Sequence, residues 1–231
     1  MLEIISPSFN ELNNIDRFIN ETRTTLSLHD IEDYLITIVD DGSEQTSLLF
    51  YEKYKLDEDI RIILLARNYG HQVALLAGLE NAKGDYILCL DLDLQDPIEI
   101  GIQMYEKCIS EEIDCVIGVR AKRKGESVFK LLTAKIYYKL LSYIVNDISL
   151  KDFSSGDFYC INKKFKDALI SDLPSRLYLR GKIQTLGFRK SILLYVRETR
   201  KLGFTKFTLS KMLSFALSGV LSISNKPLRL I

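Results

Sequence analysis

A short acidic segment, Asp91-Leu92-Asp93-Leu94-Gln95-Asp96-Pro97, follows an apolar run at 86–90. An apolar run that ends abruptly in acids is typical of a buried strand that carries carboxylates to the open edge of a sheet. In an extended chain Asp91 and Asp93 point the same way, with Cα atoms roughly 6.5–7 Å apart. One hard divalent cation, with its waters and a diphosphate, fits between two such carboxylates. The segment therefore predicts chemistry on a nucleoside diphosphate.

Strand and helix signals alternate over the first 120 residues. Strands are expected at 2–8, 34–39, 61–65, 86–90 and 114–119, with helices between them. Strands joined by helical crossovers predict an α/β fold with a mainly parallel sheet covered on both faces. Ligands bind such sheets at the carboxyl ends of the strands, and four polar clusters fall there: 6–11, 40–43, 67–70 and 91–96. The GxGxxG and GxxxxGK[ST] patterns are absent, which disfavours dinucleotide and P-loop sites.

The second half of the chain is less regular. We expect helices at 127–145, 163–171 and 175–184, strands at 156–161 and 192–196, and a final amphipathic helix at 208–222. The apolar face of that final helix is explained equally well by packing on the domain and by lying on a bilayer.

Composition limits the class of protein. A chain of 231 residues with 47% hydrophobic residues suits one large globular domain. Four cysteines without a CxxC pair predict buried thiols in a reducing compartment, and two histidines exclude a histidine-rich metal site. The sequence from Met1 predicts no signal peptide, and the apolar runs fall short of the ~18 residues of a membrane span.

Charge is divided between the two halves. Residues 1–119 hold 8 Lys and Arg against 24 Asp and Glu, whereas residues 120–231 hold 23 against 7, so the balances are −16 and +16. Such asymmetry indicates partners rather than a fold. The basic half suits phosphates on a membrane, a nucleic acid or a phosphorylated acceptor, although a solvated lysine-rich surface has the same composition.

The ordered set of motifs resembles the family 2 inverting glycosyltransferases of GT-A fold. The similarity is to the polyprenyl-phosphate type, meaning dolichol-phosphate mannose synthases and bactoprenol glucosyltransferases. It covers nearly the whole chain and is carried by the segments 6–11, 39–43, 67–72, 77–79, 91–97, 155–158, 179–181, 187–188, 197–206 and 226–229. Departures are Phe9 in place of the family's usual tyrosine and the lack of tryptophan, which the family has near Tyr105 and Gln184.

The resemblance implies a division of the chain. Residues 1–206 would form the GT-A domain, with a nucleotide-sugar half at 1–119 and an acceptor half at 120–206. Residues 207–231 would be a basic amphipathic interfacial segment, which in the family precedes two transmembrane helices that this sequence lacks. The expected location is the cytoplasmic face of a membrane. The expected partners are a nucleoside-diphosphate sugar, a polyprenyl phosphate, the membrane surface and a second copy in a homo-oligomer, and nucleic acid is not expected.

The resemblance also assigns residues. Asp91 and Asp93 would bind Mg²⁺ or Mn²⁺, and Asp157 and Asp93 would be catalytic. The donor nucleotide would be bound by the four strand-end clusters: Pro7, Phe9, Asn10, Glu11, Asp40, Arg67, Asn68, Gly70, Gln72, Asp91, Leu92 and Gln95. The diphosphate and the acceptor phosphate would be bound by basic residues and a serine of the second half: Arg120, Arg123, Ser127, Lys130, Arg197, Arg200 and Lys206.

Several alternatives remain open at this level. Asp157 is interpreted as a base that deprotonates a saccharide hydroxyl, as a positioning group for an acceptor phosphate that is already anionic, or as a turn residue. Residues 40–43 suit a tight turn, and Asp96 suits the capping position before Pro97. A catalytically silent nucleotide-sugar-binding module is the remaining functional alternative. His71 is expected to pack or hydrogen-bond at a helix start rather than to act as a base.

Overall fold

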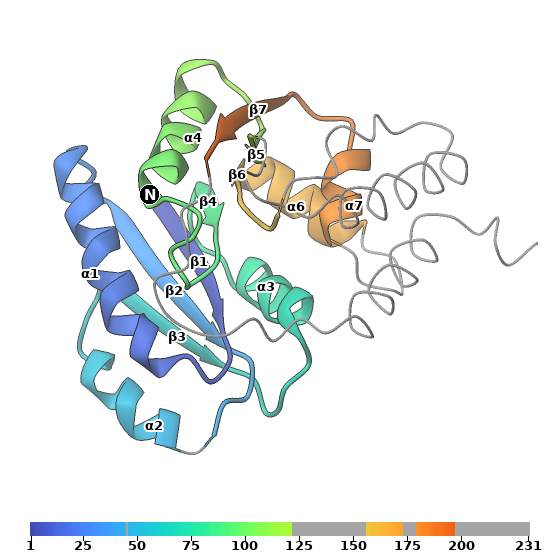
Figure 1. The fold of residues 1–231 in the computed structure, drawn as a ribbon. Helices are drawn as coiled ribbons and strands as arrows, with labels where there is room; N and C mark the ends of the chain where they lie inside the picture. Colours follow the sequence, from blue (N-terminus) through green and yellow to red (C-terminus); the bar gives the residue numbers. More distant parts are fainter. Residues whose placement is uncertain (45, 122–155, 173–178, 197–231) are drawn as a thin grey trace, which may run out of the picture.

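The structure is a computed structural model that describes residues 1–44, 46–121, 156–172 and 179–196 (Figure 1). Its strands are β1 (Leu2–Ser8), β2 (Tyr34–Asp40), β3 (Ile60–Leu64), β4 (Tyr86–Cys89), β5 (Cys115–Arg120), β6 (Tyr159–Asn162) and β7 (Lys190–Tyr195). Its helices are α1 (Leu12–Leu28), α2 (Thr46–Tyr51), the 3₁₀ turn η1 (Glu52–Tyr54), α3 (His71–Glu80), α4 (Ile98–Ser110), α6 (Lys163–Ser171) and α7 (Leu179–Thr185).

The described strands form one sheet in the order β3-β2-β1-β4-β6-β5-β7. All pairs are parallel except those of β6, which is antiparallel to both β4 and β5. The expected mainly parallel sheet is therefore confirmed. Placing β6 between β4 and β5 brings the residues just before β6 to the edge where β4 and β5 end.

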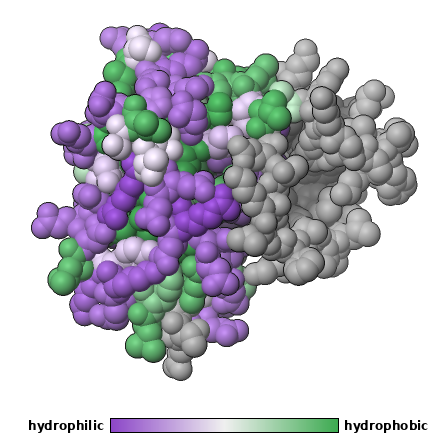
Figure 2. All heavy atoms as spheres, turned by 60° about the vertical axis from the view of Figure 1, so that its left-hand side comes forward, coloured by the Kyte–Doolittle hydropathy of each residue, from purple (hydrophilic) through white to green (hydrophobic). Residues whose placement is uncertain are grey.

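Helices cover both faces of the sheet, as predicted. The helices α1, α2 and α4 lie on one face and α3, α6 and α7 on the other (Figure 1). Successive side chains of the buried strand β1 point to opposite faces of the sheet and so contribute to both apolar layers. Leu2 and Ile4 pack with α1 and α4, and Ile5 packs with α3. The face that carries α1 and α2 is mostly hydrophilic, with scattered apolar areas (Figure 2).

Glu3 is the exception within β1, because its side chain is fully buried. One carboxylate oxygen accepts hydrogen bonds from the Thr37 hydroxyl and Arg61 Nη2, at 2.6 and 2.5 Å. The other accepts the backbone N–H groups of Lys83 and Gly84, at 2.6 and 2.9 Å. These bonds join β1, β2, β3 and the turn before β4, so this acid is part of the core.

Element boundaries differ modestly from the sequence-based expectations. The strand expected at 156–161 begins only at Tyr159, and that expected at 192–196 begins at Lys190. Among the described residues no helix is long and apolar enough to cross a membrane. The helices expected at 127–145 and 208–222, and the segment 207–231, lie outside the described residues.

Candidate active site

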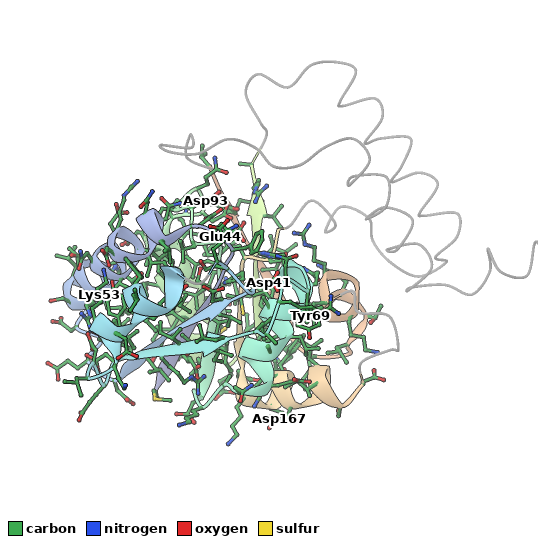
Figure 3. The ribbon with its side chains drawn as sticks, turned by 90° about the horizontal axis from the view of Figure 1, so that it is seen from below. Asp41, Glu44, Lys53, Tyr69, Asp93 and Asp167 are labelled. Atoms are coloured by element: carbon green, nitrogen blue, oxygen red, sulfur yellow. The ribbon has the colours of Figure 1, made fainter. Side chains whose placement is uncertain are left out.

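The predicted site lies where the parallel strands end, the edge that faces the viewer in Figure 3. Backbone hydrogen bonds tie the ends of β1, β2 and β3 together: Asp41 N–H donates to Ser8 O at 2.8 Å, and Leu65 N–H to Asp40 O at 2.9 Å. Asp41, Tyr69 and Asp93, from three different strand-end loops, gather on this edge (Figure 3).

The loop after β1 is fastened to the loop after β2 through Asn10. Its backbone N–H donates to Ser43 Oγ at 2.8 Å, and its Oδ1 accepts the Glu44 N–H at 3.3 Å. Asn10 has φ of +52°, a left-handed conformation that asparagine tolerates. Glu11 is the N-cap of α1 without a side-chain capping bond. Phe9, which precedes Asn10, is 37% exposed, whereas Pro7 is buried within β1.

Asp40, at the end of β2, is bonded within the protein. Its Oδ2 accepts the Tyr51 hydroxyl at 2.5 Å, and its Oδ1 accepts the Ser43 N–H at 2.7 Å. Burial, followed by the hydrogen bond and charge of Asp40, raises the pKa of Tyr51 far above its usual value, so this hydroxyl remains a donor. Asp40 therefore holds α2 and the tight turn after β2, at the edge of the sheet where the nucleotide site is expected.

Asp41 orders the loop after β3, a role that the sequence analysis missed. Its carboxylate accepts bonds from Asn68 Nδ2 at 3.0 Å and from the backbone N–H groups of Tyr69 and Gly70, each at 2.8 Å. Gly42 next to it has φ of +71°, and an added Cβ would lie 2.2 Å from the Arg67 carbonyl carbon. The signal available in the sequence was the pair of adjacent acids in Asp40-Asp41-Gly42. Asp40 bonds within the turn after β2, and Asp41 bonds to the loop after β3.

The acidic segment is a turn rather than the extended end of a strand, which corrects the geometry assumed from the sequence. β4 ends at Cys89, residues 92–94 turn, and Leu94 has φ of +56°, an uncommon conformation for a bulky residue. Asp93 Oδ1 accepts the Gln95 N–H at 3.1 Å, and Leu92 is 2% exposed and packs in the core. The turn thus buries Leu92 and leaves Asp91 and Asp93 partly exposed.

A divalent cation at these two carboxylates would need further ligands from a substrate. Among the described residues no group of three or more His, Cys, Asp or Glu side chains is arranged to hold a metal ion. Mg²⁺ is commonly held by one or two carboxylates, with phosphate oxygens and water filling the other positions. Burial, and then the charges of Asp157, Asp96 and Asp93, raise the pKa of Asp91 despite the opposing effect of His71. A nearby cation would relieve that accumulation of negative charge.

Asp157, in the turn before β6, is surrounded by hydrogen-bond donors. Arg180 binds it with two bonds, Nε to Oδ1 at 2.8 Å and Nη2 to Oδ2 at 2.6 Å. Gln72 Nε2 donates to Oδ2 at 2.9 Å, and His71 Nε2 also lies 2.9 Å from Oδ2. Burial alone would raise the pKa of Asp157, but Arg180 and then His71 outweigh it and hold the pKa far below its usual value.

The start of α3 and the start of α7 meet at this carboxylate. The same Nε2 of His71, the first residue of α3, also lies 3.6 Å from Asp91 Oδ1. Burial lowers its pKa, but the hydrogen bond and charge of Asp157, with the charge of Asp91, raise it to about 8. Gln72 Oε1 accepts the Leu179 N–H at 3.2 Å. The motif Leu179-Arg180-Gly181 is visible in the sequence, but it predicted no role for Arg180.

Arg120, expected at a phosphate, lies at the end of β5 beside Asp96. Its Nη2 is 3.4 Å from Asp96 Oδ2, and its Nε donates to the Tyr195 hydroxyl at 3.1 Å. The Tyr195 hydroxyl donates to Asp96 Oδ1 at 2.5 Å. The N-cap position of α4 is Pro97, which has no side-chain capping bond, so Asp96 lies one residue before the cap rather than at it.

The other predicted phosphate contacts, Arg123, Ser127, Lys130, Arg197, Arg200 and Lys206, lie outside the described residues. Within those residues the predicted positions Asp91, Asp157 and Gln72 are linked through shared contacts, with His71 and Arg180 added. Arg67, Asn68 and Gly70 form the neighbouring loop held by Asp41.

Known proteins with similar sequences and structures point in one direction. At 38% identity over 200 residues, 86% of this chain matches 61% of the uncharacterized glycosyltransferase YkcC of Bacillus subtilis strain 168. At 32% identity, 99% of the chain matches 74% of the prophage bactoprenol glucosyl transferase homolog of Escherichia coli K12. The chain thus spans less than two thirds of the first of these relatives and about three quarters of the second.

The fold also has solved counterparts. A glucosyl-3-phosphoglycerate synthase from Mycobacterium tuberculosis, in complex with Mn²⁺, UDP and glucosyl-3-phosphoglycerate, superposes with a TM-score of 0.65. That match covers 96% of this chain and 80% of the synthase at 16% identity, so the likeness concerns the fold alone. The family model of glycosyl transferase family 2 matches residues 3–184. With the family model, the relatives and the sheet in agreement, the chain belongs to glycosyl transferase family 2.

Proposed function

We propose that the chain transfers a sugar from a nucleoside diphosphate to a polyprenyl phosphate, with inversion at the anomeric carbon and with help from Mg²⁺ or Mn²⁺. The bond between the anomeric carbon and the diphosphate oxygen breaks, and the leaving nucleotide keeps the electron pair. An oxygen of the acceptor phosphate forms the new bond from the opposite face. The relatives named bactoprenol glucosyl transferase support this class of acceptor.

The observation that carries the proposal is the set of donors around Asp157. Arg180, Gln72 and His71 direct four contacts at its two oxygens, close to the full capacity of a carboxylate. A carboxylate held this firmly in its ionised form is a poor proton acceptor at neutral pH. A saccharide hydroxyl needs such a base, whereas a phosphate monoester arrives as an anion, with a second pKa of about 6.

Asp91 and Asp93 would hold the cation on the donor diphosphate. When bound, that cation neutralises the charge that develops on the leaving group, a stabilisation of several kcal/mol. The chain's own contribution is positional: Gln95 N–H orients Asp93, while Arg180 and Gln72 keep Asp157 ionised. Asp157 would orient the acceptor or the donor sugar rather than take a proton.

The test is transfer in a reconstituted system. Protein in detergent or lipid, with Mn²⁺ or Mg²⁺, is incubated with undecaprenyl phosphate and a panel of labelled nucleotide sugars that begins with UDP-glucose. We expect label in the lipid phase with at least one donor, loss of transfer with EDTA, and loss in Asp93→Asn. Asp30→Asn, an exposed aspartate at φ of +53°, is the matched control and should transfer normally.

A second arm offers saccharide acceptors with free hydroxyls to the same protein. Label that enters saccharide but not lipid, with a bell-shaped pH profile that Asp157→Asn abolishes, would replace the proposal with hydroxyl transfer. Donor binding without transfer to either acceptor would instead identify a nucleotide-sugar-binding module.

A further inference from the structure

Tyr195, at the end of β7, lies at the centre of a buried polar cluster that the proposed reaction does not use directly. The cluster consists of Tyr195, Asp96 and Arg120, from β7, the acidic turn and β5. Tyr195 is 3% exposed and Asp96 is 1% exposed. The Tyr195 hydroxyl donates to Asp96 Oδ1 at 2.5 Å and accepts from Arg120 Nε at 3.1 Å. The Tyr195 hydroxyl therefore links the Asp96 carboxylate to the Arg120 guanidinium.

Each partner leads to a different part of the site. Asp96 ends the turn that begins at Asp91, three residues after Asp93, and the strained φ of Leu94 lies between them. Because this short turn has one fixed end on β4, the anchor at Asp96 sets where Asp93 lies. Removing the anchor lets the left-handed residue relax, since such conformations persist only where the surroundings impose them.

Arg120 leads to the other side of the site. Its Nη2 lies so close to Gly156 that a Cβ added there would be 2.9 Å away. Gly156 is followed directly by Asp157, the carboxylate bound by Arg180. The guanidinium therefore packs against the turn that carries Asp157, while its other bonds reach Tyr195 and Asp96.

The ring of Tyr195 is held independently of its hydroxyl. It packs edge to face on Phe158, with ring centroids 5.2 Å apart. Loss of the hydroxyl alone should leave the ring in place, because the apolar packing that fixes it is unchanged. This separates the hydrogen-bonding role from the role in the core.

We propose that Tyr195 is a positioning residue that sets Asp93 and Asp157 relative to each other, through Asp96 on one side and Arg120 on the other. The proposal rests on the proposed function: its kinetic readout needs the proposed transfer, whereas its binding readout needs only the cation site at Asp91 and Asp93. Because Tyr195 is buried, it would act through Asp96 and Arg120 rather than by touching the donor or the cation. Its hydroxyl fixes the turn that presents the metal-binding carboxylates.

The test is a double-mutant cycle of Tyr195→Phe and Asp96→Asn. Mn²⁺ affinity is measured by electron paramagnetic resonance with UDP-glucose present, and kcat and KM are measured for transfer to undecaprenyl phosphate. We expect Tyr195→Phe to weaken Mn²⁺ binding and lower kcat, each roughly tenfold or more, the size typical of one hydrogen bond to a charged group. Asp96→Asn should do the same, and the double variant should be little worse than either single one.

Tyr105→Phe is the matched control, because Tyr105 lies on α4 against Tyr86 at the start of β4, the opposite edge of the sheet. It should leave Mn²⁺ affinity and kcat at wild-type values. Tyr195→Phe with wild-type Mn²⁺ affinity, losses that multiply in the double variant, or a wild type that binds no Mn²⁺ would overturn the inference. A wild type that binds Mn²⁺ but transfers no sugar would contradict the proposed function. The Mn²⁺ affinities of the variants would then decide whether Tyr195 is a positioning residue.

Discussion

At Asp157 a buried carboxylate is kept ionised by side chains from two helices. His71 and Gln72 come from the first turn of α3, and Arg180 from the first turn of α7. The sequence predicted Asp157 and Gln72 as site residues with separate roles. It could not pair them, because 85 residues of chain separate them.

His71 should make the stability of the protein depend on pH. Its pKa is raised from 6.5 to about 8 in the folded chain. The stabilisation of the fold by its pairing with Asp157 is therefore fully present below pH 6.5 and is lost as pH rises through 8. We expect the free energy of unfolding of wild type to exceed that of His71→Gln by about 1 kcal/mol at pH 6. The difference is small because the His71 side chain is 41% exposed and solvent weakens its pairing with Asp157. The difference corresponds to roughly 2–4 °C in Tm and should vanish by pH 9.

Differential scanning fluorimetry of both proteins from pH 5.5 to 9 measures this. His29, bonded to Glu99 and Glu106, is common to both proteins, so the difference between them isolates His71. A gap in Tm that stays constant or widens as pH rises would contradict the assignment.

At the scale of elements, one buried contact ties strands together at the edge opposite the site, and a second fixes two of the loops that form it. Glu3 joins three strands to the turn before β4, and Gly42 lets the turn after β2 lie against the loop after β3. The sequence predicted most strands to within a few residues because apolar runs and turn residues are local signals. It gave no sign that Glu3 would be buried, because that depends on the partners that β2 and β3 bring.

Glu3→Gln should destabilise the fold by about 3 kcal/mol. An amide of the same shape replaces one acceptor oxygen with an NH₂ donor and leaves buried donors without partners. Urea unfolding, with fluorescence from the 12 tyrosines, measures the change. Glu80→Gln, at the exposed end of α3, should have wild-type stability. Equal midpoints for the two variants would show that the bonds to Glu3 contribute little.

Gly42→Ala should be more damaging than its small size suggests. The new methyl would lie 2.2 Å from backbone of Arg67, at φ of +71°, so both the clash and the left-handed conformation act against it. We expect a loss of about 2 kcal/mol or more and weaker donor binding, because Asn68 and Gly70 are displaced with Arg67.

Gly187→Ala is the comparison for this substitution, since an added Cβ there meets nothing within 4 Å. Thermal melts and isothermal titration with UDP-glucose and Mn²⁺ measure both effects. A Gly42→Ala protein with the Tm and donor affinity of Gly187→Ala would refute the close packing of these two loops.

At the scale of the whole molecule, the division of charge bears on where the protein would meet the proposed acceptor. The acidic half carries −16 and holds the strand-end clusters, and the basic half carries +16. A polyprenyl phosphate lies in a membrane with its charged group at the surface. A basic half would draw that surface toward the site by long-range attraction, which salt screens.

We expect the protein to cosediment with vesicles that contain phosphatidylglycerol at 50 mM NaCl and to dissociate at 500 mM, where the Debye length is only about 4 Å. Vesicles of phosphatidylcholine alone should retain much less protein. Equal binding to both vesicle types, or binding that salt does not alter, would instead indicate purely apolar attachment.

The sequence alone determined the α/β class, the family and the four polar clusters at the strand ends, because strand periodicity and strand-end motifs depend on neighbouring residues. Tertiary structure decided which side chains meet there: Arg180 and His71 on Asp157, Tyr195 on Asp96, and Asp41 on the loop after β3. Tyr195 and Asp96 are 99 residues apart in the sequence. They meet because β7, the last strand of the sheet, pairs with β5 and places Tyr195 opposite Arg120. Such contacts depend on how whole elements pack, which no local pattern encodes.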